Sequence, residues 1–263
     1  MNELAGRNIS EYIAMRKEIG RSNATINREL ALLSAAINYA NREWDWELPN
    51  VVAGRKLKEA EGRVRWLTIN EYQSLLEAAS QEPHASHLAG FIKLATHTGC
   101  RSGELLGLEW SRIDLESGIF FLEGHQTKSG KRRSIPLNST ATRVLEERDA
   151  YRLEYCPDSP WVFCRKDGSR FVSFRKSFNT ARIRAGLNDF RIHDLRHTCA
   201  AWLVSNGVPL TEVRDLLGHS TVKMTERYAH LAPENVRAAV NRLDDWSRLS
   251  HITNNAALPI SGH

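Results

Sequence analysis

The chain has 263 residues, with 36 Lys and Arg against 31 Asp and Glu, and 41% of its residues are apolar. This length and ordinary composition predict a folded protein with one or two hydrophobic cores, and exclude a disordered, collagen-like or coiled-coil chain. No apolar run approaches the roughly 20 residues of a membrane-spanning helix, and the N-terminus lacks a secretion signal, so a cytoplasmic protein without membrane contact is expected.

Two helices are predicted in residues 1–50, which we interpret as a short helical domain. Apolar residues recur at helical spacing on either side of a turn at residues 20–23, from Ile9 in the first helix to Ile37 in the second. Residues 51–66 lose this periodicity and carry more basic than acidic side chains. They are predicted to form a basic linker, for which a solvated loop and a DNA contact are equally good interpretations.

A second, larger domain is predicted over residues 67–250. Thr68 and Glu71 have the spacing of a capping box, in which each side chain satisfies a free amide at the start of a helix. Helical patterns continue to about residue 110. Two apolar runs, 118–123 and 133–137, then flank a loop with basic residues, which predicts an antiparallel hairpin with a basic tip.

The rest of this domain is predicted to be mostly helical. A helix is expected over residues 138–155, a short strand over 161–164, and further helices to residue 250. Residues 251–263 are expected to form a frayed tail. The predicted fold class is therefore mainly α with a small antiparallel β-sheet.

The cysteines show no metal-binding or disulfide pattern. They lack CxxC spacing, and scattered thiols in a chain without a secretion signal usually stay reduced. We expect neither disulfides nor structural zinc at these four positions: Cys100, Cys156, Cys164 and Cys199.

Two sequence patterns resemble nucleotide or metal sites only superficially. The loop at 124–131 has five residues between its glycines, where a phosphate-binding P-loop has four, and Arg132 stands where the magnesium-binding Ser or Thr should be. His193 and His197 have the spacing of a zinc-binding helix. Arg196 lies on the same helix face and would repel a divalent cation, so that face suits an anion better.

Positive charge is concentrated between residues 165 and 196. Nine Lys or Arg and three Asp give this segment an excess of six positive charges, and the whole chain has an isoelectric point near 9.1. Solvated faces usually alternate in sign, so this clustering favours binding to nucleic acid.

Five ordered motifs resemble those of the tyrosine recombinase (phage integrase) family. Residues 98–110 (TGCRSGELLGLEW) resemble the first conserved box of the family, and residues 193–200 (HDLRHTCA) resemble the second. Residues 216–220 (LLGHS) and 225–230 (TERYAH) follow in the family's order, and Lys128 stands on the hairpin where the family has a lysine. Each motif alone is weak evidence, whereas their joint order is specific.

The resemblance implies a DNA-cleaving site that contains Arg101, Lys128, His193, Arg196, His219 and Tyr228. Tyr228 would be the nucleophile, and its attack on a phosphodiester would leave a phosphotyrosyl link. A phenol has an ordinary pKa near 10 and needs neighbouring cations to attack as an oxyanion. Arg101 and Arg196 would bind the non-bridging oxygens as charge develops in the transition state, in place of a metal ion.

The remaining roles also come from the resemblance. Lys128 would protonate the departing 5′ oxygen, with Lys131 as a nearby alternative. His193 would accept the proton of the tyrosine, and His219 would donate a hydrogen bond to the phosphate. Glu104 is expected to orient Arg101, and His197 is expected to be supporting. The basic residues expected to contact DNA are Lys131, Arg132, Arg133, Arg175 and Lys176.

The implied function is site-specific recombination or integration through a 3′-phosphotyrosyl intermediate, with no metal ion, ATP or other cofactor. The implied partners are double-stranded DNA recombination sites and three further copies of the chain, in a tetramer that exchanges strands through a Holliday junction. The helix at 233–250 would dock on a neighbouring subunit or pack on its own. A nucleoid-associated protein of bacterial, phage or mobile-element origin is expected.

The implied fold is a recombinase catalytic domain preceded by a short helical, SAM-like core-binding domain. Residues 23–40 resemble the later helices of that domain, so residues 1–50 are interpreted as a truncated form. Two other functions remain open: a type IB topoisomerase-like enzyme that acts without paired sites, and a DNA-binding relic with impaired cleavage. A zinc hydrolase is a remote third.

Overall fold

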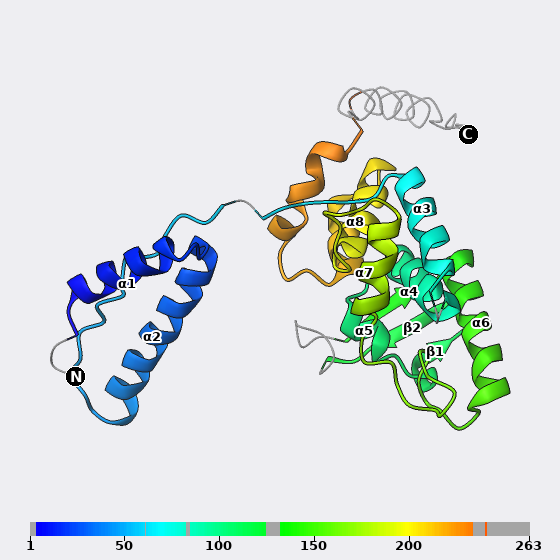
Figure 1. Ribbon diagram of the computed structural model, residues 1–263, viewed down its shortest axis with the longest axis horizontal. Coiled ribbons are helices and arrows are strands. Elements are labelled where there is room, and N and C mark those ends of the chain that lie inside the picture. The colour runs from blue at the N-terminus through cyan, green and yellow to red at the C-terminus, as the bar shows by residue number, and fades with distance from the viewer. Residues whose placement is uncertain (1–3, 61, 83–84, 125–131, 234–239, 241–263) are drawn as a thin grey trace, which may run out of the picture. The chain divides into compact units, whose positions relative to one another are not determined.

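The computed structural model describes residues 4–60, 62–82, 85–124, 132–233 and 240. The chain divides into two compact units, Met1–Arg63 and Val64–His263 (Figure 1). Helices dominate, together with one three-stranded antiparallel sheet, so the predicted fold class is confirmed. Within the ranges just given, no helix is long and apolar enough to cross a membrane.

The first unit is built on α1 (Gly6–Glu18) and α2 (Asn23–Glu43), which form where the periodicity predicts two helices. Ser22 begins α2 by accepting a hydrogen bond from the amide of Thr25. Between the helices lies a small core of buried apolar side chains: Ile9, Ile26, Leu30, Ile37 and Val52.

Part of the segment expected as a linker packs on this helix pair. The Asn27 side chain donates a hydrogen bond to the carbonyl of Leu57 and accepts one from its amide, both at 2.9 Å. Val52 is buried in the core between the helices. Residues 51–57 are therefore held against α2 by contacts that their composition does not reveal.

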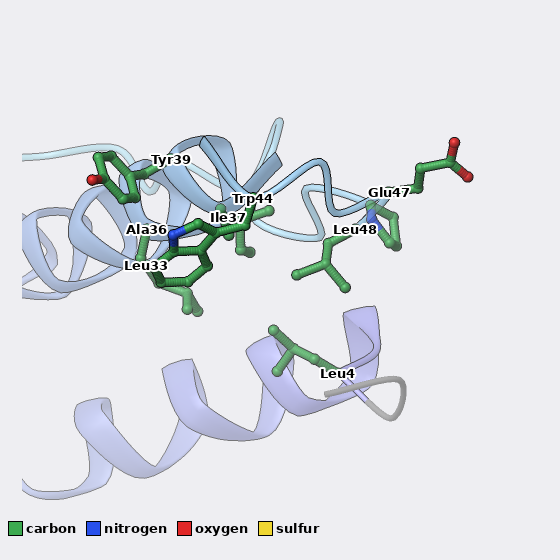
Figure 2. Close-up of a pocket in the computed structure, with 10 residues that line it drawn as sticks. Leu4, Leu33, Ala36, Ile37, Tyr39, Trp44, Glu47 and Leu48 are labelled. Carbon is green, nitrogen blue, oxygen red and sulfur yellow. The ribbon is translucent and has the colours of Figure 1, made fainter. Parts of the chain in front are cut away.

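An apolar cavity of about 600 Å³ opens in the first unit. Figure 2 shows Leu4 on one side of it and Leu33, Ile37, Trp44 and Leu48 on the other. Among the residues described, the two helices thus leave part of their apolar surface uncovered.

The second unit contains most of the helices and the whole sheet (Figure 1). Its helices are α3 (Ile69–Ser80), α4 (Ala85–Thr98), α5 (Ser102–Leu106), α6 (Ser139–Tyr155), α7 (Arg175–Arg184), α8 (Asp194–Ser205) and α9 (Leu210–Leu217), with the 3-10 turns η1 (Trp110–Arg112), η3 (Val222–Met224) and η4 (Glu226–Leu231). The capping box forms at the start of α3, where the Glu71 carboxylate accepts a hydrogen bond from the Thr68 amide at 2.9 Å and the Thr68 hydroxyl accepts one from the Glu71 amide.

The hairpin strands form as predicted. β2 (Ile119–Leu122) pairs with β3 (Arg133–Pro136) in an antiparallel register that sets buried Phe120 opposite buried Ile135. A third strand, β1 (Ile113–Asp114), adds to the other edge of β2. Its two residues are too few to show a hydrophobic period, which is why the sequence did not predict it.

The strand expected at Trp161–Cys164 is not present as a regular strand. Trp161 makes an isolated antiparallel bridge to Glu109, and Cys164 makes another to Arg170. The apolar run spans two different partners, so no continuous ladder forms. The helix expected at 233–250 and the tail expected at 251–263 lie outside the described residues, except Pro233 and Val240.

The helix α4 occupies the centre of the second unit and packs against α3, α6 and α8. A second, smaller core joins α8, α9 and η4 through Ala201, Val213, Leu217 and Tyr228. These two cores hold α4, α8 and η4 in fixed positions, and the candidate site lies where they meet.

Gly99 lies between α4 and α5 in the chain and packs closely against side chains of α8 and α9. Its φ is +64°, and a Cβ there would lie 2.4 Å from Leu217 Cδ2 and 3.2 Å from Cys199 Sγ. Glycine tolerates this backbone conformation and leaves room for both side chains. The first conserved box can therefore approach α8 and α9 only with glycine at this position.

Replacement of Gly99 by alanine should destabilise the second unit strongly. The left-handed backbone costs about 1–2 kcal/mol for an L-residue, and overpacking adds roughly 1–3 kcal/mol. The matched control is Gly118→Ala, which has the same kind of backbone, φ +65°, but no described atom within 4 Å of the added Cβ. Urea unfolding should show a clearly larger loss for Gly99→Ala, and equal losses would contradict the packing argument.

Candidate active site

Arg101 and Glu104 form the first part of the site. Arg101 is the N-cap residue of α5, and the Glu104 carboxylate accepts hydrogen bonds from the Arg101 amide at 2.7 Å and from its Nη1 at 2.8 Å. Glu104 is buried, with 3% of its surface exposed. The carboxylate therefore fixes the direction of the Arg101 guanidinium.

Arg133 joins this pair from β3. Its Nη2 donates at 2.9 Å to Glu104 Oε2, the oxygen that also accepts the Arg101 amide, and its side chain is only 11% exposed. Its Nη1 lies beside Gly218, where a Cβ would approach it to 2.2 Å. The sequence predicts Arg133 as a DNA contact, whereas the structure places its guanidinium inside the site, against a protein carboxylate.

Arg196 is the most buried of the three guanidinium groups. It extends from α8, donates from Nη1 to the Gly99 carbonyl at 2.7 Å and from Nη2 to the Leu217 carbonyl at 2.6 Å, and is 4% exposed. Burial, followed by the charge of Arg101, lowers the pKa of Arg196 to about 10. The group still carries its charge at neutral pH.

The two histidines predicted as catalytic lie next to these arginines. His193 precedes α8, and burial followed by the charge of Arg196 lowers its pKa below the ordinary value. His219 follows α9, and its Nδ1 lies 2.9 Å from the Thr225 hydroxyl. Burial, followed by Arg196 and Arg101, lowers the pKa of His219 to about 4. Both imidazoles are therefore neutral at pH 7.

Tyr228 lies on η4, and only 1% of its surface is exposed. Its hydroxyl makes a short hydrogen bond with Nδ1 of His197, and the two rings are 5.9 Å apart. Burial raises the pKa of Tyr228 to about 12, although Arg227 and Arg196 act in the opposite direction. The phenol is therefore protonated at neutral pH and held by an imidazole.

The structure brings together most of the residues that the sequence predicts. Five of them come from four segments: Arg101, His193 with Arg196 at the start of α8, His219 and Tyr228. The charge of Arg196 acts on His193, His219 and Tyr228, and the charge of Arg101 acts on Arg196. Arg101 and Arg133 bond to one buried carboxylate, Glu104, whose charge also acts on Arg196. The excess of guanidinium groups makes the pocket suited to an anion such as a phosphodiester. Lys128 and Lys131 lie outside the described residues.

The other predicted DNA contacts lie on the surface. Arg175 and Lys176 are exposed at the start of α7. Arg132 is 61% exposed, forms an ion pair with Glu123 at 3.3 Å, and lies over the Phe121 ring.

Many basic side chains of the segment 165–196 make contacts within the protein. Arg182 donates to the carbonyls of Leu187 and Asn188, and Arg184 donates to the Ala78 carbonyl and to Glu82. Other members lie over aromatic rings: Arg165 over Phe171, Lys166 over Tyr155, and Arg170 over Trp161. These contacts fix the side chains in place, while Arg165, Lys166, Arg170 and Arg184 remain exposed.

Three residues that shape the site were not predicted from the sequence. Gly99 and Gly218 keep space for Leu217 and Arg133, and Thr225 bonds to His219. The glycines stand inside the conserved boxes, but their packing role depends on neighbours far away in sequence. Among the residues described, no cluster of three or more His, Cys, Asp or Glu side chains is placed to hold a metal ion.

The lowered pKa of His219 should make stability depend on pH. Unfolded His219 would titrate near 6.5, whereas the folded group titrates at about 4. Between these values the unfolded chain binds the extra proton, so this contribution to stability is complete above pH 6.5 and is lost as pH falls toward 4. Urea unfolding from pH 4.5 to 7.5 should give a shallower dependence for His219→Asn. Exposed His230→Asn is the control, and parallel curves for His219→Asn and wild type would refute the assignment.

Known proteins match both the sequence and the fold. The profile of the phage integrase family matches residues 65–235. The integrase of Salmonella phage P22 is 32% identical over 234 residues, which cover 84% of this chain and 57% of that protein. Tyrosine recombinase XerD of Bifidobacterium longum is 28% identical over 249 residues, covering 88% of this chain and 79% of that protein. The chain spans between half and two thirds of the length of several such relatives.

Solved structures agree on the fold. The Tn1549 transposon integrase, in complex with a circular intermediate DNA, matches with a TM-score of 0.74 and 21% identity over 92% of this chain and 86% of that chain. A fragment of lambda integrase, as a dimer bound to a core site, matches with a TM-score of 0.71 and 24% identity over 86% of this chain and 80% of that chain. The profile match extends over every segment that supplies the pocket described above, and the chain therefore belongs to the phage integrase family.

Proposed function

We propose that this protein is a site-specific DNA recombinase that cleaves and rejoins DNA through a covalent bond to Tyr228. The observation that carries the proposal is the convergence of Arg101, Arg196, His219 and Tyr228 in one cationic pocket. Membership of the phage integrase family supports it, because the family profile extends over all of these residues.

The arginines supply the charge for phosphate binding. Glu104 accepts a hydrogen bond from Nη1 of Arg101. Two backbone carbonyls accept hydrogen bonds from Nη1 and Nη2 of Arg196. Each guanidinium has five N–H donors, so each retains donors for the non-bridging oxygens of a phosphodiester. Because both groups are fixed before DNA arrives, little reorganisation is needed as negative charge develops.

Tyr228 is the proposed nucleophile. Its Oη attacks the scissile phosphorus, the bond to the 5′ oxygen breaks, and the 3′ end stays attached as a phosphotyrosyl ester. Lys128 is proposed to protonate the departing 5′ oxygen. The new ester preserves the energy of the broken bond, so a 5′ hydroxyl can reverse the reaction without ATP.

The histidines are proposed to act as neutral imidazoles. When the Thr225 hydroxyl donates to Nδ1 of His219, the ring hydrogen lies on Nε2, which then donates to a phosphate oxygen. The family resemblance gives His193 the role of proton acceptor for Tyr228. The pKa of His193 is lowered, so this ring is mainly uncharged at neutral pH.

Paired double-stranded recombination sites are the proposed substrate. The named relatives are integrases and recombinases of phages, transposons and bacteria, which supports a mobile-element or chromosomal origin. Exposed Arg132, Arg175 and Lys176 are proposed to bind the DNA backbone. Strand exchange is proposed to occur in a tetramer through a Holliday junction, with the segment after Tyr228 docked on a neighbouring subunit.

Loss of the Tyr228 hydroxyl should abolish covalent capture of DNA. Wild type and Tyr228→Phe are incubated with genomic DNA of the source organism and denatured, and the DNA that stays bound to protein is sequenced. Wild type should retain DNA ends at a few defined sequences, whereas the variant should retain none while it still binds DNA.

The pattern of capture separates the alternative functions. Ends spread over unrelated sequences would instead support a topoisomerase-like enzyme. Binding by wild type without any capture would support a relic without cleavage. Equal capture by Tyr228→Phe would show that another residue is the nucleophile.

Loss of the Arg101 guanidinium should slow cleavage without abolishing DNA binding. Removal of one such donor costs roughly a hundredfold to a thousandfold in rate. Arg152→Ala is the matched control, because Arg152 also pairs with an acid three residues away at 2.8 Å and is 22% exposed, compared with 25% for Arg101. The rate of covalent capture in a single turnover should fall for Arg101→Ala alone, and equal rates for the two variants would remove Arg101 from the mechanism.

A further inference from the structure

His197 contacts the reacting atom of the proposed nucleophile. It follows Arg196 directly on α8, and its Nδ1 makes the short hydrogen bond with Tyr228 Oη. The resemblance gave the proton-acceptor role to His193 and left His197 as supporting. The tyrosine hydroxyl, however, forms its hydrogen bond with His197.

Because Tyr228 is buried, its proton needs an acceptor within the protein. The phenol is buried in the core formed by α8, α9 and η4, and only 1% of its surface is exposed. Solvent therefore has little access to its proton, which must pass to a neighbouring group as the oxygen attacks. A general base must lie within hydrogen-bond reach of the proton that it removes, and His197 meets this requirement.

We propose that His197 is the catalytic residue that accepts the proton of Tyr228, an assignment that rests on the proposed recombinase function. As the bond from Oη to phosphorus forms, the O–H bond breaks and the proton moves to Nδ1. The bond from phosphorus to the 5′ oxygen breaks, and a separate ammonium side chain, Lys128 in our proposal, protonates that oxygen. In the rejoining step the attacking 5′ hydroxyl gives its proton back to the neutral amine of Lys128, and His197 returns its proton to the departing phenolate.

This role requires the hydroxyl to donate and Nδ1 to carry a lone pair, which places the ring hydrogen of neutral His197 on Nε2. The imidazolium formed in the reaction lies near cationic Arg196, which disfavours it. The buried carboxylate of Asp194 acts electrostatically on both His193 and Tyr228 and offsets part of this repulsion.

His193 takes a positioning role in this arrangement. Its ring is perpendicular to that of His197, with centroids 5.4 Å apart. Contact of this kind restricts rotation of the His197 ring and keeps Nδ1 directed at Tyr228.

The test measures single-turnover formation of the phosphotyrosyl link on a synthetic duplex of the sequence recovered by covalent capture. The duplex is made with either oxygen or sulfur at the 5′ bridging position of the scissile phosphate. A thiolate leaves without protonation, because thiol pKa values are near 8.5. The sulfur duplex therefore removes the need for a general acid and retains the need for a base.

The variants are His197→Asn, His197→Ala and Lys128→Ala, with exposed His230→Ala as the matched control on η4. Asparagine keeps an acceptor near the position of Nδ1 but does not take up a proton. Both His197 variants should lose about 100- to 10,000-fold in rate on both duplexes. Lys128→Ala should be slow only on the oxygen duplex, and added imidazole should partly rescue His197→Ala.

Three outcomes would overturn the inference. If His197→Asn cleaves at the wild-type rate, the histidine only positions the tyrosine. If His197→Ala cleaves faster, the contact holds Tyr228 in a resting state. If the His197 defect disappears on the sulfur duplex, His197 acts on the leaving group. Failure of wild type to capture DNA, or capture by Tyr228→Phe, would instead refute the proposed function, so the two failures are distinguishable.

Discussion

The buried guanidinium of Arg196 is the interaction on which the site depends. Its two hydrogen bonds join the carbonyl of Gly99, after α4, to that of Leu217, at the end of α9. These segments are 97 and 21 residues away from Arg196 in sequence, and no local interaction would bring them together. A buried charge is tolerated only when its donors are satisfied, so the position of Arg196 also fixes the turn before Arg101 and the turn before His219.

Glu104 provides the opposite charge. One carboxylate orients Arg101 through both its amide and its guanidinium, and holds Arg133 from the sheet. Glu104 pairs with Arg101 and Arg133 and acts electrostatically on Arg196, so the three guanidinium groups outnumber it and are already aligned. Such preorganised charge is more effective in catalysis than mobile surface charge, because it need not reorient as the transition state forms. The sheet therefore contributes to the site through Arg133 as well as through the hairpin that it carries.

The proposed nucleophile is protonated in this environment. Burial raises the pKa of Tyr228 to about 12, and the cations Arg227 and Arg196 only partly oppose this effect. The phenol therefore keeps its proton at neutral pH. His219 is also uncharged at neutral pH, because burial and the charge of Arg196 lower its pKa. A positive charge on His219 would add to the repulsion among the cations of the pocket.

The sequence by itself determined the family, the capping box at Thr68 and the hairpin strands, and it named the candidate site residues, because these depend on local spacing or on the order of motifs. It did not predict that Arg133 is buried against Glu104, that Arg182 and Arg184 serve internal contacts, or that residues 161–164 form no strand. The resemblance gave the proton-acceptor role to His193, whereas helical spacing alone does not separate His193 from His197, because residues four apart share one helix face. Only the position of η4 decides which imidazole meets Tyr228, and that position is set by packing between α8 and a turn 31 residues further along the chain.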